Sequence, residues 1–294
     1  MNMRKVKLSA TTTVDRSKEY FDKNNILIIP VPVIIDEKEY MDDRVSITPK
    51  FIYDSIREGK AVSTAANNVQ FYLDAWKDTL DEGYDIVHIG ISSGLSSDCS
   101  NAQMAAKMIE DEFGEPRVYV PDTLAATSGE ALILDYIKDF VSEGRSAKEI
   151  SDWVVENRLR VNHWFTLGDL SYLLKGGRIT KAQYMVANTL NIYPVMWMDA
   201  EGKLAHRKKA RGMKRALLTI LETIEKLADN GLEYNEKIYI SNSDCHEDAE
   251  FMRNMILDKF KKVKSVEIFD MIQIGCHTGP GCVSMYFWGK SRAE

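Results

Sequence analysis

Short apolar runs rich in β-branched residues alternate with helical patterns through the first half of the chain. Residues 67–83 place apolar side chains on one helical face, and residues 97–113 repeat that spacing. Strands that alternate with helices in this way are typical of a mostly parallel α/β sheet. The predicted strands are KVKLSA, ILIIPVPVII, DIVHIGI and PRVYVPD, at residues 5–10, 26–35, 85–91 and 116–122.

The pattern changes near residue 160. Residues 168–191 predict two short helices around a glycine pair, and residues 193–210 predict a hairpin that turns at 199–202. A helix at about 212–229 and three further apolar runs follow. We therefore expect a two-domain α/β protein: a mostly parallel sheet in residues 1–160 and a mixed sheet in residues 161–294.

Composition places the chain among globular proteins. It has 294 residues, of which 45% are apolar and 28% charged. A formal charge of −6 argues against a general nucleic-acid binder, which would be strongly basic. The first 21 residues lack the apolar run of a signal peptide, and no segment approaches the ~20 apolar residues of a membrane span. The four cysteines show no disulfide or zinc spacing, so we expect a cytoplasmic protein.

One motif raises the question of hydrolysis. Gly90-Ile91-Ser92-Ser93-Gly94 satisfies G-x-S-x-G, the nucleophile turn of serine hydrolases, and it stands between an apolar run and a helical pattern. An esterase would need Ser92 activated by a histidine, and His277 lies late enough in the chain for that order. The alternative is a turn whose serines cap the next helix.

Four polar clusters follow predicted strands, where open α/β sheets gather their ligands. Ser96 lies where a helical pattern starts, so its hydroxyl and the next amides could bind an anion or could merely cap the helix. Capping also explains much of STAANN, whereas CHTGPG resembles a backbone loop close to a ligand. No usual metal spacing is present. The clusters are STAANN, SSGLSSD, DTLAATSG and CHTGPG, at residues 63–68, 92–98, 122–129 and 276–281.

Two basic segments stand out in this acidic chain. HRKKARGMKR, at residues 206–215, is either a solvated face or a dock for an acidic partner or phosphate groups. KGGRITK, at residues 175–181, is a second basic loop whose glycines suit exposure.

In their order along the chain these segments resemble the DegV family, the bacterial fatty-acid-binding proteins that act with fatty acid kinase. The likeness covers essentially the whole chain. The most specific matches are LLKGGRITK, NIYPVMWMDAEGKL and HTGPG, which begin at residues 173, 191 and 277.

Other family segments are altered here. The family's Asp-Ser-Thr-x-Asp loop is TTTVD, with Thr11 in place of the first aspartate. Its Thr-Ser-Gln-Pro segment is STAA at 63–66, which keeps hydroxyls but loses Gln and Pro. Its Ser-Ser-x-Leu-Ser-Gly loop is SSGLSS at 92–97, with serine in place of the glycine. These changes leave the exact hydrogen bonds open.

The resemblance implies a buried fatty acid between or beneath two α/β domains and no other cofactor. The protein would present the carboxylate to the catalytic subunit of a separate kinase, and it would contact a membrane surface transiently. The implied carboxylate ligands are Ser63, Thr64, Ser96, His277 and Thr278. The implied partner contacts are Lys175, Arg178 and Lys181, with Arg211 near the head group or the partner. The alternatives are the esterase using Ser92 and His277, a binding module for another small acid, and a lipid-responsive regulator.

Overall fold

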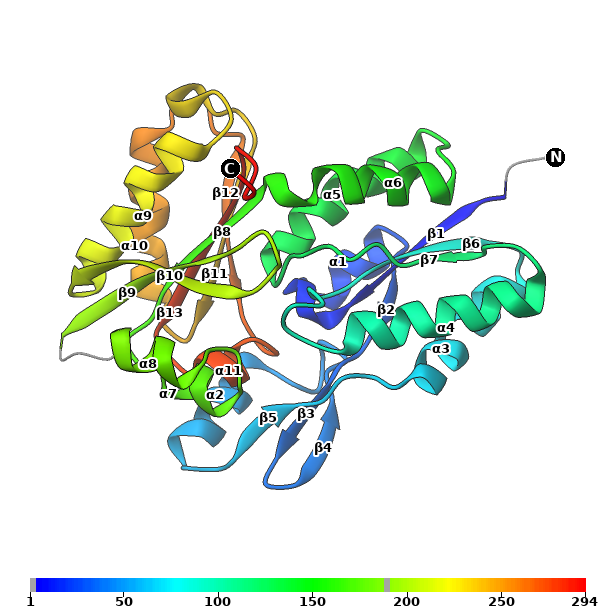
Figure 1. The fold of residues 1–294 in the computed structure, drawn as a ribbon, viewed down its shortest axis with the longest axis horizontal. Helices are drawn as coiled ribbons and strands as arrows, with labels where there is room; N and C mark the ends of the chain where they lie inside the picture. Colours follow the sequence, from blue (N-terminus) through cyan, green and yellow to red (C-terminus); the bar gives the residue numbers. More distant parts are fainter. Residues whose placement is uncertain (1–3, 188–190) are drawn as a thin grey trace.

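The computed structural model describes residues 4–187 and 191–294, and it contains three β-sheets in that part of the chain (Figure 1). Sheet A has the order β2-β1-β6-β7, and every neighbouring pair is parallel. This confirms the predicted parallel sheet of the first half. Its strands are β1 (Val6–Thr11), β2 (Leu27–Ile29), β6 (Asp85–Ile89) and β7 (Val118–Tyr119).

Helices cover both faces of sheet A. On one face, α3 (Val69–Asp81) and α4 (Asp98–Phe113) bury an apolar cluster that includes Trp76 and Ala105. Gly114, in the left-handed conformation, ends α4. The other face carries α1 (Lys18–Lys23), α5 (Ser128–Ser142) and α6 (Ala147–Asn157).

The predicted strand at residues 26–35 is wrong in one respect, because it is two strands in two sheets. β2 ends at Ile29, and β3 (Pro32–Ile35) belongs to the antiparallel sheet B, of order β4-β3-β5. Pro30 and Pro32 lack the N–H that a continuous ladder needs, so the chain changes direction between them. The other elements here are β4 (Lys38–Met41), α2 (Pro49–Arg57) and β5 (Val62–Thr64).

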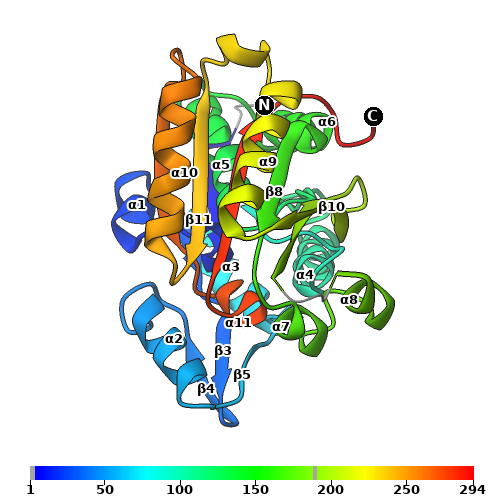
Figure 2. The same cartoon turned by 90° about the vertical axis from the view of Figure 1, so that its left-hand side faces the viewer.

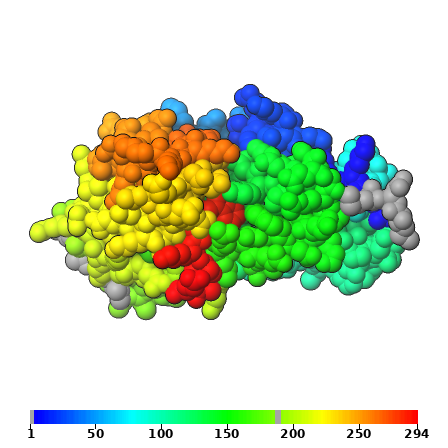
Figure 3. Space-filling view, turned by 90° about the horizontal axis from the view of Figure 1, so that it is seen from above, coloured from blue at the N-terminus to red at the C-terminus, as the bar shows by residue number. Residues whose placement is uncertain are grey.

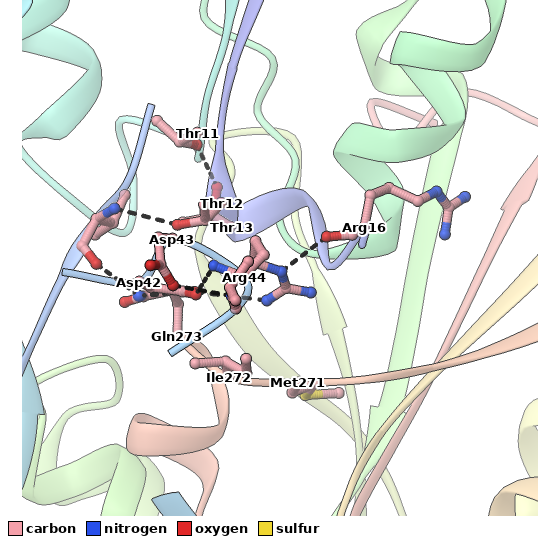
Figure 4. Close-up of polar contacts among 12 residues, drawn as sticks. Thr11, Thr12, Thr13, Arg16, Asp42, Asp43, Arg44, Met271, Ile272 and Gln273 are labelled. Atoms are coloured by element: carbon pink, nitrogen blue, oxygen red, sulfur yellow. Dashed lines mark hydrogen bonds and ion pairs between the residues drawn. The ribbon is translucent and has the colours of Figure 1, made fainter. Parts of the chain in front are cut away.

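Residues 31–66 form a small lobe below the rest of the molecule (Figures 1 and 2). Its apolar cluster includes Ile272 and Cys276, which come from the far end of the chain. A part-buried polar contact adds to this attachment, because the Nε atom of Arg44 donates to the Arg16 carbonyl (2.8 Å) (Figure 4). Within the lobe, the Nη1 atom of Arg44 lies 3.5 Å from Asp42 Oδ2.

Sheet C is the mixed sheet that the sequence predicts for the second half, and its strand order is β10-β9-β8-β13-β11-β12. Only β11 and β12 pair in parallel; the other neighbours are antiparallel. The predicted hairpin is confirmed, with the Gly202 amide donating to the Asp199 carbonyl (3.1 Å). Its strands are β8 (Val161–Thr166), β9 (Ile192–Met198), β10 (Leu204–Arg211), β11 (Lys237–Ser243), β12 (Ser265–Asp270) and β13 (Cys282–Trp288).

The helices of the second half lie against sheet C and above the lobe. α9 (Met213–Leu227) and α10 (His246–Lys259) pack on sheet C, and α5 from the first half contacts β8, β11 and β13. Since both faces are covered, every residue of β13 is buried. Three short helices complete the site region: α7 (Ser171–Lys175), α8 (Lys181–Ala187) and α11 (Gly275–Thr278). The predicted segment 168–191 is thus two helices as expected, with residues 188–190 outside the described part.

The two halves are joined by the chain end and by the β9–β10 hairpin. The guanidinium of Arg292 donates to the carbonyls of Asp199 (2.7 Å), Leu124 (2.6 Å) and Arg158 (3.2 Å). Figure 3 shows the C-terminal residues lying over the junction between the green and yellow parts of the chain. Sheet A lies before residue 160 and sheet C after it, but one apolar core runs through both. A boundary at 160 between independently folding domains stays a prediction.

Three short 3₁₀ helices complete the inventory of described elements, and they lie at turns: η1 (Thr12–Val14), η2 (Arg158–Arg160) and η3 (Gly231–Glu233).

Candidate functional site

A cavity of about 840 Å³, partly open to solvent, lies where sheet A, the lobe and sheet C meet. Its wall is mainly apolar, as the walls of small-molecule sites usually are. Both halves of the chain contribute, so the cavity exists only in the assembled fold. Its larger apolar side chains include Ile91, Leu95, Trp164, Phe165, Met198 and Leu204.

Thr64 and His277 form a polar pair in the cavity wall. Thr64 ends β5 in the lobe, His277 lies in α11, and Thr64 Oγ1 is 2.8 Å from His277 Nε2. His277 is only 7% exposed. Burial, with a smaller contribution from the nearby Arg178 charge, lowers the pKa of His277 to about 3. The imidazole is therefore neutral at physiological pH, as the hydroxyl is.

The loop of residues 175–178, which we call the Arg178 loop, packs directly on this pair. A Cβ atom added at Gly176 would lie 2.6 Å from His277 Nδ1, so only glycine allows this approach. Arg178 is half-buried and lines the cavity, and its Nη1 atom donates to the Gly176 carbonyl. Burial lowers the pKa of Arg178, although an arginine stays protonated in proteins.

Arg178 has no carboxylate within ion-pair distance among residues 4–187 and 191–294. A guanidinium held in a mainly apolar wall without a counter-ion is suited to bind an anion from solution, because its charge is poorly solvated and geometrically ready for a carboxylate. The sequence predicts Arg178 as a partner contact, and the structure places this residue, half-buried, in the cavity wall. Its contact with a partner stays a prediction.

Ser96 and Thr278 also line the cavity. The Ser96 hydroxyl accepts a hydrogen bond from the Asp98 amide (3.2 Å) at the start of α4, so it does contribute to the helix cap. In the described part of the chain nothing accepts its proton, which leaves that proton for a ligand. Thr278 is buried and donates to the Gly279 carbonyl (3.2 Å).

Four other predicted site residues do not reach the cavity. Ser63 is exposed, because successive strand residues point to opposite faces and its neighbour Thr64 faces inward. Arg211 is exposed at the end of β10, Lys175 is exposed in the Arg178 loop, and Lys181 is exposed at the start of α8. The structure therefore brings Thr64, Ser96, Arg178, His277 and Thr278 together at the cavity, without Ser63, Arg211, Lys175 and Lys181.

The geometry does not support the esterase alternative. Ser92 is fully buried, and its hydroxyl donates to the Gly202 carbonyl (3.0 Å) and accepts from the Gly94 amide (3.1 Å). His277 makes its side-chain hydrogen bond with Thr64 rather than with Ser92. A nucleophile needs a base within hydrogen-bond reach, and Ser92 has none there. Ser92 holds the β9–β10 hairpin against the loop after β6.

Buried carboxyl groups near the cavity are held toward their neutral forms. Asp98 lines the wall and accepts hydrogen bonds from Tyr72 Oη (2.6 Å) and the Asn67 amide (2.9 Å), yet burial raises its pKa. Glu130 accepts from Thr13 Oγ1 (2.8 Å), and complete burial raises its pKa well above the usual value.

The described residues contain no group of three or more His, Cys, Asp and Glu side chains placed to hold a metal ion. They also contain no helix that is both long enough and apolar enough to cross a bilayer.

The fold and site together define an α/β protein that encloses a mainly apolar cavity with an arginine, hydroxyls and a neutral imidazole in its wall. The chain belongs to the DegV family, whose model matches residues 5–290. A DegV domain-containing protein of Clostridium perfringens is 31% identical over 292 residues, which are 99% of each chain.

Solved structures of similar fold have been described with fatty acids. A DegV family protein from Thermus thermophilus, described for its fatty acid binding, is 26% identical with a TM-score of 0.87, over 98% of this chain and 100% of that one. The fatty acid kinase B3 protein of Streptococcus pneumoniae, loaded with linoleic acid, is 20% identical with a TM-score of 0.83, over 97% and 100%. The second likeness shows the fold alone.

Proposed function

We propose that this protein binds a long-chain fatty acid, with the hydrocarbon tail in the cavity and the carboxylate at Arg178. Thr64, Ser96 and His277 would complete the head-group site as neutral hydrogen-bonding groups. The observation that carries the proposal is the guanidinium of Arg178, which lies in an apolar wall with no carboxylate beside it in the described structure. A monoanion with an apolar body matches that combination. Fatty acid binding by the T. thermophilus relative supports the same ligand class.

The tail and the carboxylate of the ligand would contribute differently to the free energy of binding. Burying each methylene contributes about 0.8 kcal/mol, so a long tail supplies roughly 10 kcal/mol before the costs of association. A hydrogen bond to a charged group contributes about 1.5–3 kcal/mol net, and a neutral one about 0.5–1.5 kcal/mol. The tail therefore supplies most of the affinity, and the polar cluster determines which end of the ligand lies at Arg178.

We further propose that the bound carboxylate is presented to a fatty acid kinase, which would form the acyl phosphate. The chain has no Walker A or protein-kinase signature of its own, so ATP and metal would come with the kinase. Lys175, in the Arg178 loop, and Lys181, at the start of α8, are both exposed and could meet an acidic surface of that partner. The family likeness to the S. pneumoniae protein motivates this step.

Loading from a bilayer is part of the same proposal. Met185 in α8 is 68% exposed, and Lys181 lies at the start of the same helix. An exposed apolar side chain beside a cation suits brief contact with an anionic membrane surface.

Lipid identification tests the ligand directly. The protein is purified from expressing cells and extracted, and the extract is analysed by mass spectrometry for lipids present in stoichiometric amounts. Arg178→Met should carry much less fatty acid, whereas Lys181→Met, which changes a neighbouring surface cation, should carry the wild-type amount. Wild-type protein that holds no fatty acid, and takes none up from solution, would contradict the proposal.

Transfer to a kinase needs its own assay. Protein loaded with hexadecanoate is mixed with ATP, Mg²⁺ and the catalytic subunit of a bacterial fatty acid kinase, and acyl phosphate is trapped with hydroxylamine. The double variant Lys175→Glu/Lys181→Glu should slow trapping while lipid content stays at the wild-type level. If the double variant and the wild-type protein give equal transfer, these lysines are not part of the docking surface. No transfer by wild-type protein to its cognate kinase would overturn presentation but not binding.

A further inference from the structure

Gln273 lines the cavity and is 2% exposed, and the head-group site does not use its side chain. It lies four residues before His277, in the helical turn that leads into α11. Residues four apart in such a turn lie on the same face, with Cβ atoms about 5–6 Å apart. Gln273 therefore stands one turn along from the imidazole of the head-group cluster.

The orientation of this amide is determined by its neighbours. Gln273 Nε2 donates to the Val31 carbonyl (2.9 Å) and to Asp42 Oδ2 (3.2 Å) (Figure 4). Exchanging the two ends of the amide would place Gln273 Oε1 against the Val31 carbonyl, which can only accept. The nitrogen is thus fixed toward the lobe, and the oxygen faces elsewhere.

Gln273 Oε1 is buried and has no hydrogen-bond donor in the described part of the protein. Leaving a buried acceptor unpaired is costly, and native proteins pair nearly all of them. Among the described residues of the cavity wall, only one other has a buried polar atom without a partner. It is Trp164, whose indole Nε1 is itself a donor and needs an acceptor instead.

We propose that Gln273 Oε1 accepts a hydrogen bond from a hydroxyl on the ligand, so that the protein prefers fatty acids hydroxylated near the carboxylate, such as 3-hydroxy acids. This inference rests on the proposed fatty acid site. An ionised carboxylate carries no proton and cannot satisfy Oε1, so the donor must lie elsewhere on the ligand. One helical turn between Gln273 and His277 corresponds to a few carbons of chain, which selects a hydroxyl close to the acid group.

Competition against a fluorescent fatty acid tests the preference. Wild-type protein should bind 3-hydroxyhexadecanoate more tightly than hexadecanoate, by about 3–10-fold for one neutral hydrogen bond. Gln273→Met keeps the side-chain length and removes the acceptor, so the two acids should bind it about equally. Tyr53→Phe is the matched control: it removes another lobe contact, Tyr53 Oη to the Met271 carbonyl (2.8 Å), outside the cavity lining. It should lower stability and keep the preference.

A second comparison requires no variant. 12-Hydroxyoctadecanoate carries its hydroxyl far from the acid, so it should bind wild-type protein no better than octadecanoate. Equal affinity of wild-type protein for 3-hydroxyhexadecanoate and hexadecanoate would overturn the assignment of Gln273, as would a preference that Gln273→Met retains. In both cases hexadecanoate still binds and the proposed function stands. If none of these acids binds, the proposed function fails and this inference fails with it.

Discussion

The Ser92 turn, residues 92–96, and the Arg178 loop make an instructive pair. Each uses a glycine to approach another segment closely: a Cβ atom at Gly94 would lie 2.6 Å from the Glu201 carbonyl oxygen, and one at Gly176 would lie 2.6 Å from His277 Nδ1. The Ser92 hydroxyl has both its donor and acceptor capacity filled by the protein. Arg178 has its charge unmatched.

Whether a polar group already has its partners within the protein distinguishes a structural loop from a binding loop. The G-x-S-x-G motif and the basic KGGRITK segment do not make that distinction. A polar group whose hydrogen bonds are all made within the protein stabilises the fold and has nothing left for a ligand. A charge that the fold keeps half-buried without a counter-ion has its strongest interaction still to make. On this criterion we propose that the G-x-S-x-G match is structural and that the Arg178 loop binds the ligand.

Removing the unmatched charge should have the largest effect. Arg178→Met should weaken fatty acid binding about 10–100-fold, the equivalent of the 1.5–3 kcal/mol of a charged hydrogen bond. Displacement of a fluorescent fatty acid measures this, with Lys181→Met as a control that stays near wild type. If Arg178→Met binds the fatty acid as tightly as wild type, the Arg178 loop is not the binding loop that this comparison requires.

Adding a methyl group to each loop sharpens the comparison. Gly94→Ala would drive a Cβ atom into the backbone of the β9–β10 hairpin, so it should lower the free energy of unfolding by about 1–3 kcal/mol, or more if the hairpin cannot shift. Gly176→Ala would press mainly on the imidazole of His277, and displacing that ring would break its hydrogen bond with Thr64. It should therefore reduce affinity more than stability. Denaturant titration measures the loss of stability in each variant, and ligand displacement measures the loss of affinity. A larger loss of affinity in Gly94→Ala, or a larger loss of stability in Gly176→Ala, would contradict the roles proposed for the two loops.

The buried His277 should make the stability of the ligand-free protein depend on pH. The pKa of His277 is about 3 when folded, against about 6.5 for an exposed histidine. Between these values only the unfolded chain takes up the proton, so stability falls as pH drops through 6.5. From about pH 7.5 to about pH 5 the loss due to His277 should be roughly 2 kcal/mol.

His277→Gln should lack that part of the loss while other buried groups titrate as before. The measurement is the free energy of unfolding of both proteins at the two pH values. A difference between the proteins that is the same at both values would show that His277 titrates normally. Bound fatty acid should shrink the effect, because a carboxylate beside the imidazole raises its pKa.

The smallest effects are expected from single hydroxyls. Ser96→Ala should weaken binding about 3–10-fold, as for one neutral hydrogen bond. Ser92→Ala should cost about 1 kcal/mol of stability and leave affinity unchanged. Exposed Ser63, replaced by alanine, should alter neither. If the Ser92→Ala protein folds normally but no longer binds ligand, the G-x-S-x-G motif has a functional role after all.

Much of this architecture was predictable from local patterns. The parallel strands, the β9–β10 hairpin and the two short helices around Gly176 and Gly177 follow apolar periodicity and turn residues. The division of residues 26–35 between two sheets does not, because an apolar run does not say which partner strand each half will find. The prolines at 30 and 32 were the available signal.

The site was harder to predict in two places. Arg178 lies in a basic, glycine-containing loop, a composition typical of surfaces, and its place in the cavity wall depends on how that loop packs against the rest of the fold. Gln273 gave no signal at all beyond being a polar residue in an apolar run. Its proposed role depends on the lobe accepting hydrogen bonds from Gln273 Nε2 and leaving Oε1 without a donor.

By itself the sequence determined the order of strands and helices, the family likeness and the presence of hydroxyl and imidazole groups after particular strands, since these depend on neighbours in the chain. The tertiary structure alone decided which of Ser63 and Thr64 faces the cavity, because alternation along a strand sets opposite faces and only the pairing of β5 with β3 chooses between them. It also decided the contact of Thr64 with His277, 213 positions away. Contacts at that separation come from packing, which local pattern does not encode.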